Sequence, residues 1–468
     1  MPVRRAHCPD RRRYTPSAVE FVDHASLRFA QEGRTLLTDP WYTGRAFDDG
    51  WSLLSGSTRS LEDVRPDAIW YSHEHPDHFS IADLRQIDPA DRPAMTITAR
   101  RGKDRKILNF CEGLGFRTFD LEADRWHDII PGLRGRSGQV GSDSWLCVDD
   151  GAQRYLNTND CQFRDEAALR LVREALGGPV DVLATQFTYA NWAGNPDDDH
   201  GPEIAQNMVD AHVRRQIEVF EPRYVVLFAS FVWACHEENH WWNDRLPTPG
   251  HAAAVVAGAG ADPVLLVPGQ RWRPGDRHDF AAAVRFWQEA RARAAQRPRV
   301  RSEPCTLEQL QHALAEMRAR LAQDNDMQAL ARVLDMDPTL IRVEDLNLRI
   351  ELNICDEPRF LAADGPWDVS LSSAALRSVF RDRWGRGTLT VNGRFRANYR
   401  TFERFIRQTQ LYYLNNIGRT YPGSVHADEL AEANTFALDL TRAVMAETDV
   451  DLRGRRRTAP TSAARGTS

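Results

Sequence analysis

The chain has 468 residues, of which 42% are hydrophobic, and its 60 basic and 66 acidic residues give a formal net charge of -6. This apolar content excludes a disordered protein and is enough for one large domain with one or two smaller ones. The near balance of charge produces no overall field, so neither nucleic acid nor a membrane is expected as a partner. No stretch approaches the roughly 20 apolar residues of a membrane helix, and no apolar run follows the first basic residues. We therefore expect a cytoplasmic protein.

The seven cysteines are scattered along the chain and include no Cys-x-x-Cys pair. This pattern favours neither a disulfide framework nor a zinc ribbon. We expect reduced cysteines that are mostly buried.

The predicted elements begin after residues 1–16, which we expect to be a disordered tail. Alternating apolar residues predict strands first, at 19–22, 26–30, 35–39, 68–72 and 95–98. Apolar residues at three- and four-residue spacing then predict helices at 165–176 and 204–220, which flank strands at 181–187 and 224–230. Strands followed by strands that alternate with helices predict a layered sheet sandwich with helices outside.

A change of composition after residues 264–269 indicates a domain boundary near residue 280. We assign 17–280 to a metal domain, 281–340 to a helical linker, 341–452 to a C-terminal α+β module and 453–468 to a disordered tail. Within the linker and the module the sequence predicts helices at 306–323 and 401–417 and strands at 349–354 and 388–395. The last strand carries an Asn-Gly turn signal.

Four potential metal ligands follow a predicted strand directly in AIWYSHEHPDHFS: His73, His75, Asp77 and His78. Alternate side chains of an extended segment share a face, so His73 and His75 can reach one ion. The turn forced by Pro76 can send Asp77 and His78 to a second position. Imidazole and carboxylate groups at this density suit zinc, iron or manganese.

This cluster, together with HASLRF, TDPW, NTNDC and CHEEN, resembles the metallo-β-lactamase superfamily. The sequence is most similar to the metal domain of CMP-sialic-acid hydroxylase (CMP-N-acetylneuraminate hydroxylase), more clearly over residues 17–245 than over 340–418. The resemblance implies an α/β protein, an αββα sandwich with a smaller C-terminal α+β module. It also implies that Asp160 bridges two ions and that His236 is the last histidine ligand. His240 could replace His236 if that short segment is helical.

One histidine ligand of the superfamily is missing here, because the loop GRSGQVGSDS has Gln139 near the expected place. The first site then keeps His73, His75 and Asp160, and the second keeps Asp77, His78, Asp160 and His236. Two histidines with carboxylates and open positions resemble non-haem iron sites. His127 is a possible substitute ligand, although a strand-entry or cap position is its more common kind of role.

The resemblance further implies roles around the metals. Asp77, His78 and Asp160 are the expected catalytic residues. His24, Asp39 and Gln139 are the expected second layer of contacts, since metal-bound imidazoles usually donate their other N–H to an acceptor. The segment 185–201 either contacts substrate, through Tyr189, Asn191 or Trp192, or is a solvent-exposed loop.

The first functional hypothesis is an oxygenase with one or two iron ions that acts on a small polar metabolite. The Cys-x-His and Cys-x-x-His pairs of a Rieske module are absent from the sequence, so electrons would come from a separate donor protein. The alternative is a hydrolase of an ester, amide, lactone or phosphodiester that uses a metal-bound hydroxide, with zinc or manganese in place of iron. A metal-stabilised binding scaffold is the non-catalytic reading. The sequence leaves the substrate and the oligomeric state open.

Overall fold

The computed structural model describes residues 17–57, 59–102, 105–123, 125–431 and 436–455. The chain divides into two compact units. The first comprises Met1–Tyr189, Gln206–Cys235 and Asn243–Arg299, and the second comprises Ala190–Ala205, His236–Trp242 and Val300–Ser468. The tail predicted at 1–16 and most of the one predicted at 453–468 lie outside the described residues, as does Cys8.

The first sheet of the first unit contains seven strands in the order β16-β1-β2-β3-β5-β6-β7. Their bounds are β1 Ala18–Asp23, β2 Ser26–Gln31, β3 Arg34–Thr38, β5 Ala68–Tyr71, β6 Thr96–Arg100, β7 Arg117–Leu121 and β16 Arg271–Trp272. Strands β3, β5, β6 and β7 are parallel to one another. The ends of β3 and β5 therefore lie at one edge of the sheet, where Asp39 and Ser72 follow them.

The second sheet also has seven strands, in the order β15-β13-β12-β11-β10-β9-β8. Their bounds are β8 His127–Ile130, β9 Leu133–Val140, β10 Asp143–Asp149, β11 Arg154–Asn159, β12 Val182–Gln186, β13 Tyr224–Phe228 and β15 Asp262–Val264. Because β10 runs antiparallel to β11, the start of β10 lies at the same edge as the end of β11. Asp143 and Asp160 are thereby placed at that edge.

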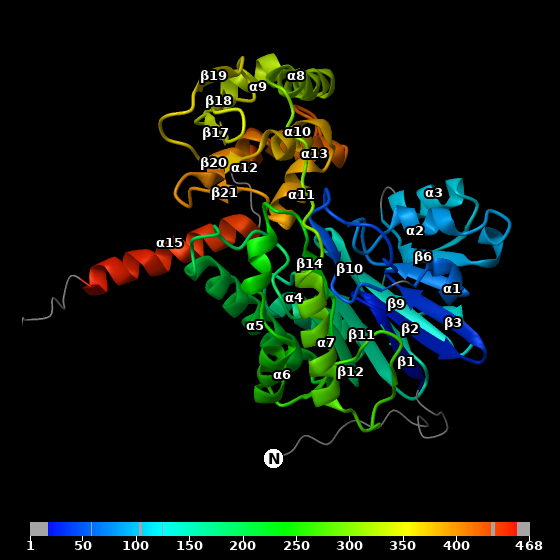
Figure 1. Ribbon diagram of the computed structural model, residues 1–468. Helices are drawn as coiled ribbons and strands as arrows, with labels where there is room; N and C mark the ends of the chain where they lie inside the picture. Colours follow the sequence, from blue (N-terminus) through cyan, green and yellow to red (C-terminus); the bar gives the residue numbers. More distant parts are fainter. Residues whose placement is uncertain (1–16, 58, 103–104, 124, 432–435, 456–468) are drawn as a thin grey trace, which may run out of the picture. The chain divides into compact units, whose positions relative to one another are not determined.

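The two sheets face each other and helices cover their outer faces (Figure 1). The helices are α1 Leu61–Val64, α2 Ile81–Gln86, α3 Lys106–Gly113, α4 Glu166–Leu176, α5 His200–Phe220, α6 Pro249–Gly258 and α7 Phe280–Ala295, and α5 starts in the second unit. Helix α3 packs on β6 and β7 and buries Leu108 and Cys111 there, while α6 packs on β13 and β15. A short ribbon of β4 (Trp51–Leu53) and β14 (Val232–Ala234) completes the unit. The predicted αββα sandwich is confirmed.

Local signals in the sequence explain where a helix such as α4 begins and ends. The side chain of Asp165 accepts a hydrogen bond from the backbone N–H of Ala168, which caps the first turn. Gly177 ends the helix in the left-handed conformation, with φ 74. Between them Leu169, Val172 and Leu176 form the buried stripe, and each buried side chain of this kind contributes about 1.5–3 kcal/mol.

The predicted linker at 281–340 is wrong as a single segment, because α7 belongs to the first unit and α8 (Leu307–Asp324) to the second. Trp287 of α7 is 1% exposed, stacks on Phe231 with ring centroids 4.0 Å apart, and donates from its Nε1 to the carbonyl of Leu266. The many arginines and alanines of this helix hide an apolar stripe in the sequence. That stripe packs α7 into the core.

The second unit contains a five-stranded sheet in the order β19-β18-β17-β20-β21, with helices around it. The strands are β17 Thr339–Val343, β18 Leu348–Leu352, β19 Arg359–Ala362, β20 Val369–Leu371 and β21 Arg396–Ala397. The helices are α8, α9 Met327–Val333, α10 Ser373–Arg381, α11 Gly385–Asn392, α12 Phe402–Gln408, α13 Gln410–Asn416, α14 Ala427–Ala431 and α15 Phe436–Arg455.

The predicted strand at 388–395 is wrong, because most of this segment belongs to α11. Gly393 follows the helix with φ 65, and its N–H donates to the carbonyl of Leu389. The Asn-Gly pair therefore ends a helix and does not form a hairpin turn. The predicted strand at 349–354 overlaps β18, and the predicted helix at 401–417 is the pair α12 and α13.

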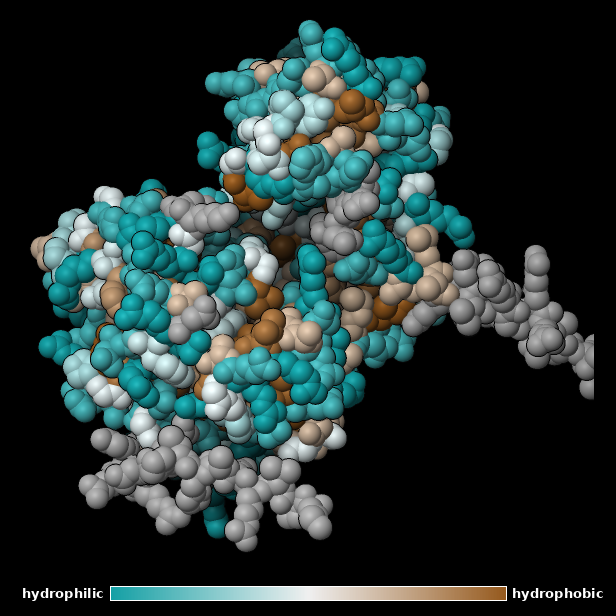
Figure 2. Space-filling view, turned by 180° about the vertical axis from the view of Figure 1, so that it is seen from behind, coloured by the Kyte–Doolittle hydropathy of each residue, from teal (hydrophilic) through white to brown (hydrophobic). Residues whose placement is uncertain are grey.

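The molecular face in Figure 2 is mostly hydrophilic, with apolar residues scattered over it. Over the described residues, no helix combines the length and the apolar character needed to cross a membrane.

Candidate metal centre

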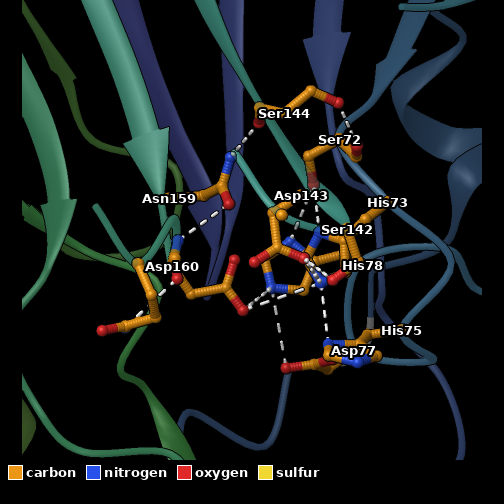
Figure 3. Close-up of polar contacts among 12 residues, drawn as sticks. Ser72, His73, His75, Asp77, His78, Ser142, Asp143, Ser144, Asn159 and Asp160 are labelled. Carbon is orange, nitrogen blue, oxygen red and sulfur yellow. Dashed lines mark hydrogen bonds and ion pairs between the residues drawn. The ribbon is translucent and has the colours of Figure 1, made fainter. Parts of the chain in front are cut away.

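The histidine and aspartate side chains of interest gather at the ends of strands from both sheets of the first unit (Figure 3). Asp143 opens β10, and the other members follow β5 or β11: His73, His75, Asp77, His78 and Asp160. Two hydrogen bonds join these strand ends, because the Ser144 hydroxyl donates to the carbonyl of Ser72 and the Asn159 side chain donates to the carbonyl of Ser144. The edge of the sandwich thus positions the cluster.

The backbone turns sharply before Asp160. Asn159 has φ 38, a left-handed conformation that asparagine tolerates better than most residues. Its side-chain oxygen accepts a hydrogen bond of 2.7 Å from the N–H of Asp160. The NTND sequence therefore turns the Asp160 carboxylate toward the histidines.

Two groups of ligand atoms lie close enough to hold an ion. In one, the Nε2 atoms of His73 and His78 are each 3.6 Å from Oδ2 of Asp160. In the other, Oδ2 of Asp77 is 3.3 Å from Nε2 of His24 and 3.7 Å from Nε2 of His78. His75 adjoins the first group, with its Nδ1 2.8 Å from Nε2 of His73. His78 belongs to both groups and thus stands between two potential ion positions.

Asp39 and Ser72 orient two of the imidazoles from behind. The Ser72 hydroxyl donates to Oδ2 of Asp39 at 2.8 Å and lies 2.9 Å from Nδ1 of His73. The same carboxylate oxygen is 3.1 Å from Nδ1 of His78. These contacts assign the ring protons to Nδ1, so that both Nε2 lone pairs face the cluster. The resemblance pointed to Asp39, whereas Ser72 was missed although it directly precedes His73.

The hydrogen bonds of His24 assign it a supporting role. The backbone N–H of Phe231 donates to its Nδ1 at 3.3 Å, so the ring proton is on Nε2. That Nε2–H donates to Oδ2 of Asp77 at 3.3 Å. Burial lowers the pKa of His24 despite the nearby Asp77 carboxylate, which keeps the ring neutral. His24 therefore orients Asp77.

The electrostatics of the cluster favour a bound positive charge. Burial disfavours the protonated form of His78, yet the carboxylates of Asp160, Asp77 and Asp39 outweigh it and raise its pKa to about 10. Burial and the neighbouring His73 lower the pKa of His75 to about 4. The carboxylates are thus dense enough to place a proton on one imidazole.

Two carboxylate oxygens test whether a metal fits these residues. Oδ1 of Asp77 and Oδ1 of Asp160 are buried and have no hydrogen-bond partner within the described part of the chain. Buried anionic oxygens without partners are costly, and a cation would satisfy both. The donors are imidazole nitrogens and carboxylate oxygens, which transition metals accept. The residues therefore fit a metal centre.

Asp143, and not Gln139, lies beside the first histidine. Oδ1 of Asp143 is 3.9 Å from Nε2 of His73, and burial together with Asp160 raises the pKa of Asp143 to about 6 against the opposing effect of His73. Gln139 is exposed at the end of β9, where it accepts a hydrogen bond from Arg100 and donates to the carbonyl of Gly141. The expectation that Gln139 supports the site is wrong, because this strand end has left the core. Asp143, near the end of the same loop, was the sequence feature that could have identified this acid.

The remaining histidines have other surroundings. His236 belongs to the second unit, where its Nε2 is 3.1 Å from the Ser302 hydroxyl and its Nδ1 accepts from the N–H of Glu238. It belongs to neither group of ligand atoms, and its role as a ligand stays a prediction. His240 begins a 3-10 helix, so its segment is helical. His127 opens β8 and accepts a hydrogen bond from the N–H of Glu122, which is a strand-entry role.

The predicted substrate residues differ in their exposure. Trp192 is 1% exposed and stacks on Phe395 within the second unit, so the solvent-exposed reading is wrong for this residue and its indole offers no surface to a substrate. Tyr189, in the first unit, is 2% exposed. Asn191 is half-buried, and its substrate role stays a prediction.

No thiol of the described residues belongs to the groups of ligand atoms. All cysteines that the structure describes are free, and each of them except the half-buried Cys355 is buried. Cys161, which follows Asp160, is among the buried ones. The donor set is therefore built from nitrogen and oxygen.

Comparison with known proteins gives matches to part of the chain. The family model described as a beta-lactamase superfamily domain matches residues 18–209. The cytidine monophosphate-N-acetylneuraminic acid hydroxylase of Danio rerio is 23% identical over 241 residues, which cover 47% of this chain and 39% of that protein. The Xenopus laevis protein of the same name is 27% identical over 152 residues, or 31% of this chain and 25% of the relative. The chain thus matches less than half the length of these relatives.

Solved structures resemble part of the chain as well. CmlA, a diiron beta-hydroxylase from Streptomyces venezuelae, matches with a TM-score of 0.40 and 16% identity, over 56% of this chain and 54% of its own. Igni18, a metallo hydrolase from Ignicoccus hospitalis, has a TM-score of 0.39 and 16% identity, over 55% of this chain and 98% of its own.

Proposed function

We propose that the protein is a metal-dependent enzyme and, more specifically, a non-haem iron oxygenase, because residues 18–209 match the model of a beta-lactamase superfamily domain. Its substrate would be a small polar metabolite. Partial matches to the cytidine monophosphate-N-acetylneuraminic acid hydroxylases support oxygenation over hydrolysis.

The position of Asp143 supports iron most directly. With its carboxylate 3.9 Å from Nε2 of His73, the first ion would have two imidazoles, from His73 and His75, and carboxylates from Asp143 and Asp160. Zinc hydrolases more often use three histidines, or two with one carboxylate. A donor set of imidazoles and several carboxylates is typical of non-haem iron.

The chain's own residues divide the work around such a centre. Asp77 and His78 would hold the second ion. Asp160, whose Oδ2 is 3.6 Å from Nε2 of His78, would serve both ions. The burial of Asp77 and His78 excludes bulk water from that position, while His24 and Asp39 fix the directions of their donor atoms. Iron bound there would supply redox chemistry with dioxygen, which zinc lacks.

A separate electron-donor protein is part of the proposal. Hydroxylation by dioxygen consumes two electrons that the substrate does not provide, and imidazole and carboxylate side chains do not store them. A chemical reductant replaces this partner in a test.

The test compares the iron and zinc forms of the same purified protein. Apo-protein loaded with ferrous iron and supplied with a reductant should consume oxygen above the free-iron background with candidate polar substrates. The zinc form should leave generic esters and phosphodiesters intact. Background oxygen uptake by the iron form together with hydrolysis by the zinc form would replace the oxygenase with a hydrolase.

The variant Asp143→His sharpens this test because it restores a third imidazole beside His73. We expect it to raise the ratio of zinc to iron bound from an equimolar mixture and to lower oxygen uptake. The control is Asp120→His, since the Asp120 carboxylate pairs with Arg105 and is no member of the cluster. An unchanged ratio in Asp143→His would mean that Asp143 does not select the metal.

A further inference from the structure

Two buried arginines of the second unit differ in their partners. Arg394 is 1% exposed, its Nε lies 2.7 Å from a carboxylate oxygen of Glu238, and its Nη2 donates to the Ser302 hydroxyl. Arg386 is 6% exposed. Within the described residues no carboxylate forms an ion pair with Arg386, so none of these residues supplies a counter-charge.

Neutral groups surround the Arg386 guanidinium. It lies 4.4 Å from the centre of the Tyr413 ring, and its Nη1 donates to the side-chain oxygen of Gln410 at 2.8 Å. Its Nε is buried and has no hydrogen-bond partner within the described part of the chain. Burial lowers the pKa of Arg386 to about 10, so the group is still charged at neutral pH. A buried cation without an anion is an unfavourable arrangement unless something else supplies the anion.

The start of helix α11 lies next to this charge. Arg386 is its second residue, and helical side chains lean toward the N-terminus of their helix. The N-cap residue, Trp384, makes no capping hydrogen bond with its side chain, so the first turn lacks the side-chain acceptor that usually covers it. The N–H of Gly385 already donates to the carbonyl of Asp382. The remaining N–H groups and the helix dipole at such a start favour an anion.

The backbone holds this arrangement firmly. A Cβ atom on Gly385 would lie 2.2 Å from the carbonyl oxygen of Ser378, so only glycine permits this approach of α11 to α10. Trp384 is 39% exposed and meets the Tyr413 ring edge-on at 5.5 Å. The Tyr413 ring thus contacts both the buried Arg386 guanidinium and the exposed Trp384 indole.

We propose that the second unit binds the oxyanion group of a small ligand, a phosphate or a carboxylate, through Arg386 and the first turn of α11. The planar guanidinium matches either oxyanion with paired N–H donors, and the ligand supplies the missing negative charge. Trp384 and Tyr413 border the site and contact the rest of the ligand. This site is independent of the proposed function of the metal cluster.

The test uses the full chain and measures binding of inorganic phosphate and of acetate by calorimetry at constant ionic strength in chloride. We expect saturable binding of one of them, with a rise in unfolding temperature. Phosphate binding with silent acetate identifies a phosphate ligand, and the reverse result identifies a carboxylate. Absence of saturable binding by both would overturn the proposal.

The variant Arg386→Met separates a ligand site from a structural arginine. We expect it to unfold at a higher temperature than the wild type without anion, since it removes an uncompensated buried charge, and to bind the anion at least tenfold more weakly. Lower stability with unchanged anion binding would assign Arg386 to packing. Arg386→Lys keeps the charge without the planar fork, so it should fold and bind about tenfold more weakly. Arg383→Met, at an exposed arginine nearby, should bind as the wild type does.

Discussion

The histidine cluster of the first unit and the surroundings of Arg386 in the second unit handle buried charge in opposite ways. In the cluster, buried bases and acids occur together, and the carboxylates around His78 raise its pKa to about 10. Arg386 is buried among neutral groups and keeps its charge, with a pKa of about 10. The cluster has more negative charge than its imidazoles balance, whereas no carboxylate of the described residues pairs with Arg386. Each imbalance identifies the charge of what binds there: a cation in the first case and an anion in the second.

The largest expected effect comes from removing the shared carboxylate of the cluster. Asp160→Asn should lower the metal affinity at least a hundredfold, because Oδ2 of Asp160 faces both His73 and His78 and Asp160 is the proposed bridge between the ions. Elemental analysis after equilibration against a metal buffer measures this loss. Gln139→Ala is the matched control and should keep wild-type metal content, since Gln139 is exposed and bonded to Arg100. Equal losses of metal in the two variants would mean that Asp160 contributes no more to metal binding than the exposed Gln139 does.

A smaller effect is expected from Ser72→Ala, which leaves every proposed ligand in place. The Ser72 hydroxyl joins Asp39 to the ring of His73, so its loss should loosen the ring and weaken metal binding about ten- to a hundredfold. Competition with a chelator measures the affinity. Ser17→Ala removes another buried serine, whose hydroxyl bonds Gln31, and should leave the affinity unchanged. If Ser72→Ala binds metal as tightly as the wild type does, the imidazoles are oriented without Ser72.

The two regions also differ in how far the sequence predicts them. The ligands that follow β5 are adjacent in the sequence and directly succeed an apolar strand, so their convergence could be predicted. Asp143 could not be identified in this way, because its closeness to His73 depends on the antiparallel pairing of β10 with β11 and on the contact between the sheets. In the second unit the predicted strand at 388–395 is a helix, and Arg386 looks like a surface residue in the sequence. Burial of a charge by distant helices leaves no local pattern.

His212 offers a third case, a half-buried base in the first unit without the acids that surround His78. Burial and the neighbouring Arg215 lower its pKa to about 4, and its Nε2 donates to the carbonyl of Cys161 at 3.1 Å. Unlike Arg386, a histidine can lose its proton at neutral pH. We therefore expect His212 to be neutral in the folded protein and protonated below pH 6.5 in the unfolded chain.

This difference predicts how stability changes with pH. The folded pKa of about 4 is below the unfolded value of 6.5, so between these limits the unfolded chain binds more protons and the free energy of unfolding falls as the pH falls. His212→Gln keeps a donor for the Cys161 carbonyl without the titration, and should remove about 2–3 kcal/mol of the loss between pH 6.5 and pH 4. Urea unfolding at several pH values measures it, with His312→Gln, at a 76% exposed side chain, as the control. If His212→Gln loses stability with acid as steeply as the wild type does, His212 keeps its proton on folding. The difference in pKa between His212 and His78 would then not come from the acids near each residue.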